Sequence, residues 1–241
     1  MKTTYTTFKR EMARAYAECR KRMTRRVMKP QLPEWVDACT WDEYNRLWLY
    51  HGYEGGMLTS AATTVFGRKL ICPYGQPGDQ LILGTTWATL EKYDNRKPSD
   101  LPTEEMQPST PGSVIRWDPI PIWSYFDSDE KPDGFGKLRP GRFLPGFLRD
   151  RMPRETLKIV RAERVQDITE EDAISEGIDI ECEQYHIAQN IMDNLGVVDG
   201  ASHSVERGSP EISVFKTLWE SINADRGYGW GSNPWVWILG W

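Results

Sequence analysis

The stretch from Leu157 to Gly177 constrains the fold most, because two elements of different periodicity follow each other within it. Its first half carries Leu157, Ile159 and Val165 with charged residues between them, which predicts a strand with one face in water. A short helix is expected directly after this strand. A strand that feeds a helix within so few residues indicates a fold in which helices pack next to a sheet.

The helix in this stretch has both of its ends marked in the sequence. Thr169 is suited to be the N-cap, Asp172 follows in the capping-box position, and the first turn is acidic, as the positive end of a helix favours. Gly177 is a favourable residue just after the helix. The last helical position is then Glu176, where a carboxylate faces the negative end of the helix dipole. Glu176 is either a solvated surface residue or a carboxylate held poised in a cleft, and both readings stay open at this stage.

The composition predicts a protein without a membrane segment, a metal or a cofactor. The 241 residues contain no apolar run long enough to span a bilayer and no signal peptide. The cysteines form no C-x-x-C pair, and the histidines do not pair at ligand spacing. Reduced thiols in a cytoplasmic protein are the expectation, with no metal site and no cofactor.

Positive charge is concentrated near the N-terminus. The net charge is −5, yet residues 1–30 hold ten Lys or Arg and two acidic residues. Such a cluster on an acidic body indicates a phosphate-bearing partner at one place, or else a basic helix docked on that body. An amphipathic helix is predicted over 8–23, with Lys21 and Thr24 sharing a face on its last turn. A lysine beside a hydroxyl is a possible base and nucleophile, although many helices contain such a pair.

The remaining pattern predicts an α+β fold, most simply a small closed sheet with helices at its ends. Long loops or insertions are expected near 31–66, 91–113 and 196–210 of a single domain that spans 1–241. The other expected elements are strands at 68–71, 80–87, 114–117, 122–126 and 235–239, and helices at 41–48, 185–195 and 212–222.

Two loops carry residue types that bind nucleotides. The loop 131–153 is rich in Gly, Pro and Arg, and Arg142 in it can meet a phosphate or base, although the loop can equally be a plain connection. In the glycine–aromatic loop 226–234, Tyr228 and Trp230 can stack on a base or can plug the end of a barrel.

Four motifs together resemble a known family. They are Arg20-Lys21-x-x-Thr24-Arg25-Arg26-Val27, the segment Cys72-Pro73-Tyr74-Gly75-Gln76-Pro77-Gly78-Asp79, the segment 165–173, and the run from Phe215 through Gly227-Tyr228-Gly229-Trp230 to Asn233-Pro234-Trp235-Val236-Trp237. In this order they resemble the ASCH-domain proteins of tailed phages and prophages, in the PUA-like superfamily. The resemblance implies a small mixed β-barrel with flanking helices, and a place in the bacterial host cytoplasm.

The resemblance also implies a candidate catalytic set. Small bacterial ASCH proteins include an amidohydrolase that removes the acetyl group of N4-acetylcytidine with a lysine, a threonine three residues later and a glutamate. Lys21 and Thr24 match the first two positions, and the alignment of Thr169-Glu170-x-x-Ala173-x-x-Glu176 places Glu176 on the third. By analogy, Lys21 with a pKa lowered by burial takes the proton of Thr24, and Glu176 handles proton transfer to the leaving amine.

Three functions therefore remain open. The first is binding of nucleic acid or a modified nucleotide in a basic cleft, through residues expected to be Arg20, Arg25, Arg26, Arg142, Tyr228 and Trp230. The second is hydrolysis of an acylated nucleoside by Lys21, Thr24 and Glu176. The third is a phage accessory role against host defence, with a host protein or a signalling nucleotide as the partner.

Overall fold

The computed structural model describes residues 1–43, 47–54, 57–62, 70–106, 117–181 and 209–241. Contacts between these residues divide the chain into two compact units. Unit 1 comprises Met1–Glu18 and Gln80–Glu155, and unit 2 comprises Cys19–Asp79 and Thr156–Trp241. The expectation of one domain over 1–241 stays a prediction, and each unit is described by itself.

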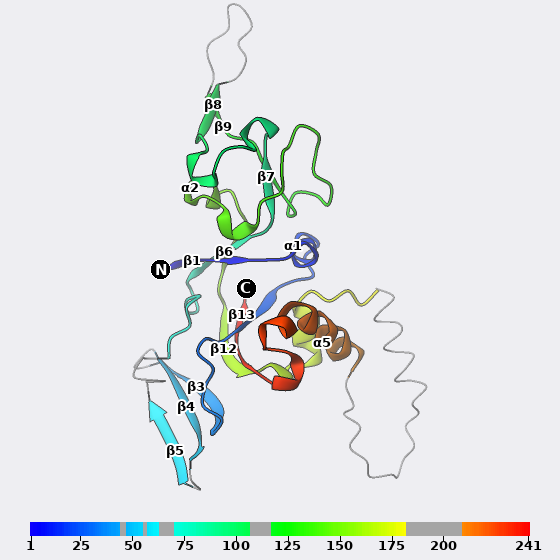
Figure 1. Cartoon of the computed structure of the whole chain (residues 1–241). Coiled ribbons are helices and arrows are strands. Elements are labelled where there is room, and N and C mark those ends of the chain that lie inside the picture. The colour runs from blue at the N-terminus through cyan, green and yellow to red at the C-terminus, as the bar shows by residue number, and fades with distance from the viewer. Residues whose placement is uncertain (44–46, 55–56, 63–69, 107–116, 182–208) are drawn as a thin grey trace, which may run out of the picture. The chain divides into compact units, whose positions relative to one another are not determined.

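Unit 1 combines short strands with short helices (Figure 1). Its sheets are β1–β6–β11, in which β1 and β6 are parallel, and the antiparallel pairs β7–β10 and β8–β9. The strands are β1 (Thr3–Thr7), β6 (Gln80–Gly84), β7 (Trp87–Thr89), β8 (Glu104–Met106), β9 (Trp117–Pro119), β10 (Ile122–Ser124) and β11 (Arg154–Thr156). The helices are α1 (Arg10–Ala17), α2 (Gly146–Arg149) and the 3-10 turns η1 (Glu91–Tyr93), η2 (Pro98–Asp100) and η3 (Gly141–Phe143).

Unit 2 contains Lys21, Thr24 and Glu176, the residues of the predicted catalytic set. Its two sheets are both antiparallel and follow the orders β12–β13–β2 and β3–β4–β5. The strands are β2 (Met23–Val27), β3 (Val36–Asp42), β4 (Leu47–Glu54), β5 (Met57–Ala62), β12 (Ile159–Arg164) and β13 (Trp235–Gly240). The helices are α3 (Glu170–Ser175), α5 (Pro210–Asn223) and the 3-10 turns η4 (Val165–Asp167), η5 (Ala224–Arg226) and η6 (Trp230–Ser232).

The central strand β13 organises unit 2. It reads Trp-Val-Trp-Ile-Leu-Gly and is buried along its whole length, as a strand covered on both faces must be. It lies between β12 and β2, and α5 packs beside this sheet (Figure 1). The core cluster between sheet and helices is formed by Met23, Val165, Ile168, Ala173, Ile178, Phe215, Trp219, Trp230, Val236 and Ile238.

The predicted strand-to-helix passage is confirmed. The side chain of Thr169 accepts a hydrogen bond from the backbone N–H of Asp172 at 3.2 Å, so Thr169 is the N-cap of α3. Gly177 adopts φ 89°, the left-handed conformation that glycine reaches without strain. Between these two ends Glu176 is the C-cap, and its backbone position is therefore fixed by signals that the sequence carries.

The helix predicted over 8–23 is wrong in its second half. α1 ends at Ala17, and Cys19 turns the chain with φ 60°. Lys21 consequently lies in a loop, and Thr24 lies on β2 rather than on a helical turn. The cause is tertiary, because Met23–Val27 pairs residue by residue with β13, and a long-range strand partner overrides a local helical pattern.

The other predictions also divide into those that a strong local pattern determines and those that long-range contacts override. The α+β class, α5 and the final strand are confirmed, since their periodicity is strong. The helix predicted at 41–48 is wrong, because this aromatic segment forms β3 and β4. The described residues form several small sheets and no closed barrel. The helix predicted at 185–195 lies outside the described residues.

The N-cap of α3 gives a stability prediction. Replacement Thr169→Ala removes the acceptor for the Asp172 N–H and should lower the free energy of unfolding by about 1 kcal/mol, whereas Thr169→Ser should retain most of it. Urea denaturation followed by tryptophan fluorescence measures the change. Thr217→Ala, on the exposed face of α5, is the matched control and should cost nothing. Equal stability of Thr169→Ala and wild type would show that the cap does not hold α3.

Candidate functional site

Lys21 and Glu176 meet inside unit 2 although they are far apart in sequence. The Lys21 Nζ atom donates to Glu176 Oε2 at 2.8 Å and to the Glu176 backbone carbonyl at 2.7 Å. The side chains are 0% and 2% exposed, so this ion pair is shielded from water. A buried charge is tolerated only when it is paired and hydrogen-bonded, and this pair meets both conditions.

Local structure explains how the two residues reach each other. Glu176 is placed by the C-terminal end of α3, and Lys21 by the loop between α1 and β2. The two segments are joined by a backbone hydrogen bond from Arg22 N to Ser175 O at 2.8 Å. The guanidinium of Arg20 also donates to the carbonyl of Gly177 at 2.7 Å. Each residue of the pair is thus flanked by neighbours that bind the opposite segment.

Arg25 is the second cation on Glu176. Its NH1 atom lies 3.3 Å from Glu176 Oε1, and its NH2 atom lies 2.6 Å from Asp172 Oδ2. The Arg25 side chain is 1% exposed, and its guanidinium lies over the Phe215 ring at 5.7 Å. Arg161 completes the chain of ion pairs, with NH2 at 2.6 Å from Asp172 Oδ2. Each oxygen of the Glu176 carboxylate therefore has a cationic donor of its own.

The faces of β2 divide the candidate residues into two groups. Side chains alternate along a strand, so Arg25 lies on the opposite face from Thr24 and Arg26. Arg25 faces α3 and α5, as its contacts with Asp172 and Phe215 require. β2 is an edge strand of its sheet. Although Arg26 lies on the other face of β2 from Arg25, its charge still interacts with the charges of Lys21 and Glu176.

The electrostatics lower the pKa of Lys21. Burial is the largest cause, and it is opposed by the attraction and the hydrogen bond of Glu176. Arg26 and Arg25 lower the pKa of Lys21 further through repulsion between like charges. The pKa of Arg26 is itself lowered by burial, opposed by Tyr74 and Glu176. A lysine with a lowered pKa gives up its proton at lower pH than a solvated lysine, which suits a general base.

Thr24 is buried at 2% exposure on β2. It is paired with Leu239 of β13, so its position along β2 is fixed by the sheet register. Within the residues that the structure describes, its hydroxyl makes no hydrogen bond to Lys21 or Glu176. The structure therefore brings Lys21 and Glu176 into contact, whereas Thr24 lies three positions after Lys21 without contacting either side chain through its hydroxyl. Hydrogen bonds between nucleophile and base are often long in the absence of substrate.

The other predicted ligand residues have different surroundings. Arg142, on η3 of unit 1, is exposed, and its guanidinium lies over the Phe143 ring at 4.6 Å. Tyr228 is partly buried, with Lys29 Nζ at 5.3 Å from its ring centre. Trp230 is buried, and its ring packs edge-on to Phe215 at 6.2 Å within the core of unit 2. The burial of Trp230 fits the alternative that it packs in the core.

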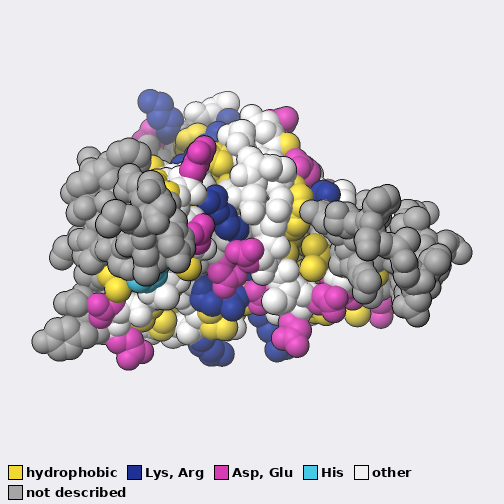
Figure 2. Space-filling view, turned by 90° about the horizontal axis from the view of Figure 1, so that it is seen from below, with side chains coloured by type: hydrophobic (Ala, Val, Ile, Leu, Met, Phe, Trp, Pro, Cys, Tyr) yellow, Lys and Arg dark blue, Asp and Glu magenta, His cyan; other side chains and the backbone are white. Residues whose placement is uncertain are grey.

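Several residues of the basic N-terminal cluster are buried or engaged within unit 2. Lys21 and Arg25 are buried, and Arg20 is engaged with Gly177. On the face presented in Figure 2, Lys and Arg side chains lie among Asp and Glu side chains. The cluster therefore serves the interior of unit 2 at several of its positions.

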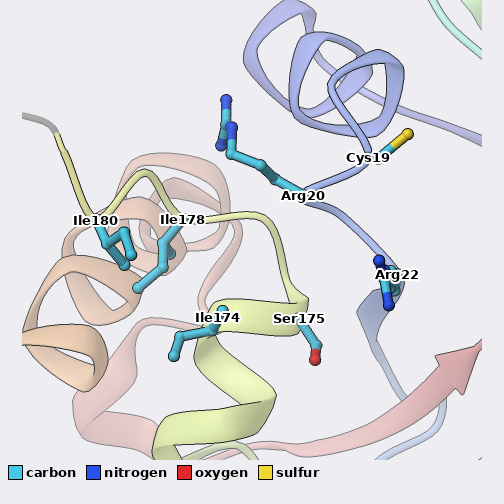
Figure 3. A pocket seen from close by; sticks show the side chains of 7 residues that line it. All are labelled: Cys19, Arg20, Arg22, Ile174, Ser175, Ile178 and Ile180. Carbon is cyan, nitrogen blue, oxygen red and sulfur yellow. The ribbon is translucent and has the colours of Figure 1, made fainter.

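A pocket of about 280 Å³ lies on the outer side of the same two segments (Figure 3). Arg20 and Arg22 come from the loop before β2, and Ile174 and Ser175 come from α3. Cys19, Ile178 and Ile180 complete the lining. The side chains of Lys21 and Glu176 do not line it, because both are directed into the interior.

Asp172 and Arg161 were missed at the level of sequence. Asp172 is one of three acids in the first turn of α3, where the helix dipole alone explains its presence. Arg161 occupies an apparently solvated position of β12. Only the fold shows that Arg25 and Arg161 converge on the same Asp172 oxygen.

Comparison of the chain with protein-family profiles, curated proteins and solved structures finds no match. The ASCH resemblance of the four motifs therefore stays a prediction. Within the described residues, no cluster of three or more His, Cys, Asp or Glu side chains is placed to hold a metal ion. None of the described helices is long and apolar enough to cross a membrane.

The lowered pKa of Lys21 predicts how stability depends on pH. Between that pKa and the ordinary value of 10.5, the unfolded chain holds a proton that the folded chain has lost. The free energy of unfolding of wild type, relative to Lys21→Met, should then rise with pH in this window by up to about 1.4 kcal/mol per pH unit. Urea denaturation at several pH values measures it, with the exposed Lys158→Met as control. A difference that stays constant with pH would show that Lys21 titrates as it does in water.

Thiol reactivity tests the burial of the cysteines. Cys19 is exposed and lines the pocket, whereas Cys72 is buried and burial raises the pKa of Cys39 to about 12. Because the thiolate is the reactive form, iodoacetamide should modify Cys19 well before the other two. Mass spectrometry of the Cys182→Ser variant reads out the order of modification. Faster labelling of Cys39 than of Cys19 would contradict the burial of Cys39 and the exposure of Cys19.

Proposed function

We propose that the protein is an amidohydrolase that acts on an acylated nucleoside through Lys21, Thr24 and Glu176. One observation carries this proposal, namely the contact between Lys21 Nζ and Glu176 Oε2 at 2.8 Å in a shielded interior. The two residues were selected from separate motifs, so their contact is not a consequence of sequence proximity. The burial that lowers the pKa of Lys21 supports the same role, because a base must be unprotonated before it acts.

In the proposed reaction, neutral Lys21 takes the proton of the Thr24 hydroxyl as its oxygen attacks the amide carbonyl carbon. The carbon–nitrogen bond then breaks, and the proton passes through the carboxyl group of Glu176 to the leaving amine. The product of this half-reaction is an ester between the acyl group and Thr24. Water hydrolyses the ester, which releases a carboxylic acid and restores the threonine.

The substrate class follows from the family resemblance. We infer an ASCH-type domain of PUA-like fold, in which the described sheets of unit 2 form part of the small barrel of that family. The corresponding substrate is N4-acetylcytidine or a related nucleoside with an acylated amino group. Supporting this inference, the strand that carries Thr24 and the helix that ends at Glu176 border the same buried cluster.

Binding of nucleic acid without chemistry has less support. It was expected to use Arg20, Arg25, Arg26, Arg142, Tyr228 and Trp230, yet Trp230 is buried, and Arg25 is 1% exposed and pairs with two carboxylates. A cation that is buried in an ion pair is not available to release counterions from a phosphate backbone. The interior position of Arg25 thus favours chemistry at the cluster over adhesion to a polymer.

The test is turnover of N4-acetylcytidine by wild type and by Thr24→Ala, followed by chromatography of the released cytidine. Loss of the nucleophile should reduce kcat at least about 100-fold while the protein remains folded. Thr217→Ala on the exposed face of α5 is the control and should keep full activity. Equal turnover by wild type and Thr24→Ala, or no turnover by folded wild type on any acylated nucleoside, would overturn the proposal.

A further inference from the structure

A lysine that serves as a base beside a glutamate poses an electrostatic problem. An opposite charge within a few ångströms stabilises the ammonium form, and Glu176 Oε2 lies 2.8 Å from Lys21 Nζ. If Glu176 were the sole charged neighbour of Lys21, its attraction would oppose the loss of the Lys21 proton without any compensating charge. The reaction proposed above is therefore favoured by a second group that compensates the Glu176 carboxylate when Lys21 becomes neutral.

Arg25 has the geometry for that task. It lies 3.3 Å from Glu176 Oε1, the oxygen that Lys21 does not use, and its side chain is 1% exposed. A guanidinium group keeps its charge at any pH at which the protein is folded, whereas an ammonium group does not. A buried carboxylate that lost its sole cation would be strongly destabilised. Glu176 retains Arg25 when Lys21 gives up its proton, so the cluster stays paired.

We propose that Arg25 is a positioning residue whose charge compensates Glu176 and thereby leaves Lys21 free to act as the base of the proposed amide hydrolysis. Asp172 holds Arg25 in place through the 2.6 Å contact with its second terminal nitrogen. Arg161 in turn contacts the same Asp172 oxygen at 2.6 Å, so Asp172 is held by two guanidinium groups. The expected effect of Arg25 on catalysis rests on the proposed function. The expected effect of Arg25 on the protonation of Lys21 rests on the ion pairs alone.

The charged groups around Lys21 act in two opposing directions, because Glu176 favours the ammonium form and the nearby arginines disfavour it. From α3 and its C-cap, Glu176 faces Lys21 directly, and Asp172 faces Arg25. From β2, Arg25 and Arg26 disfavour the ammonium form of Lys21. Two further charged residues act on neighbours of this cluster and not on Lys21 directly. Glu163 of β12 pairs with Arg161 at 3.1 Å, and Arg226 repels Arg26. Arg25 is the cation among these that contacts the Glu176 carboxylate together with Lys21.

The experiment is the pH dependence of kcat/KM for N4-acetylcytidine in wild type, Arg25→Gln and Arg25→Lys. Without the charge of Arg25, Glu176 holds the Lys21 proton more strongly, so the acidic limb should move to higher pH by about one unit or more. Activity should recover at alkaline pH, where Lys21 is neutral again. Arg25→Lys keeps the charge but cannot bridge two carboxylates, and its limb should lie between the other two.

Two comparisons make the result decisive. Arg25→Lys keeps a positive charge at this position and serves if Arg25→Gln does not fold, because its limb should still lie at higher pH than that of wild type. Arg154→Gln, at an exposed ion pair of unit 1, is the matched arginine control and should leave the profile unchanged. A structural role for Arg25 would lower activity at every pH without moving the limb. A limb that stays in place in all folded variants overturns the proposal.

A measurement without turnover separates this inference from the proposed function. In Thr24→Ala, NMR titration of lysines labelled at the ε carbon reports the protonation of Lys21, whose signal is identified by its absence from Lys21→Met. Adding Arg25→Gln to Thr24→Ala should move the Lys21 titration to higher pH. If no acylated nucleoside is hydrolysed but the titration moves, the proposed function fails and the coupling stands. If turnover is found and the titration does not move, the inferred effect of Arg25 on Lys21 is wrong and the proposed function stands.

Discussion

The buried ion pair between Lys21 and Glu176 is the interaction on which unit 2 depends. It ties the loop before β2 to the end of α3, across 155 positions of sequence. Both charges have left water, and that cost is offset because three hydrogen bonds reach Glu176 from two cations. Loss of one partner from such a cluster typically costs about 3–5 kcal/mol, since the remaining charge stays buried. The same contact therefore serves both the fold and the chemistry.

Asp172 contributes both to the fold, at the start of α3, and to the ion pairs around the candidate site. Its backbone N–H is bound by the N-cap Thr169, and its carboxylate binds Arg25 and Arg161. The helix start is thus anchored to β2 and β12, while the helix end delivers Glu176. α3 has six residues, too few to be a stable helix alone in water. Its orientation comes from these tertiary ion pairs and from its packed Ala173 rather than from its own propensity.

The sequence predicts local features well and long-range ones poorly. Thr169, Gly177 and the position of Glu176 follow from capping rules that act over a few residues. The strand β2 was read as a helical turn because its partner, β13, lies about two hundred residues away and leaves no local trace. The spacing of Lys21 and Thr24 indicates a possible base and nucleophile, and the family resemblance adds Glu176 as the third member. The role of Arg25 could not be predicted, because it depends on which face of β2 meets α3, and a shift by one residue would reverse the faces.

The order of the strands in unit 2 has a consequence for how the protein is made. The central strand β13 is synthesised long after its two neighbours, since β2 lies near residue 25 and β12 near residue 160. Until residue 240 has left the ribosome, β2 and β12 each lack their shared hydrogen-bonding partner, and Met23, Val165 and Phe215 lack the cover of Val236 and Ile238. Unpaired strand edges and exposed apolar side chains of this kind invite aggregation and chaperone binding. Lys21 and Thr24 therefore leave the ribosome long before Glu176, and the sheet that fixes the position of Thr24 is completed only after both.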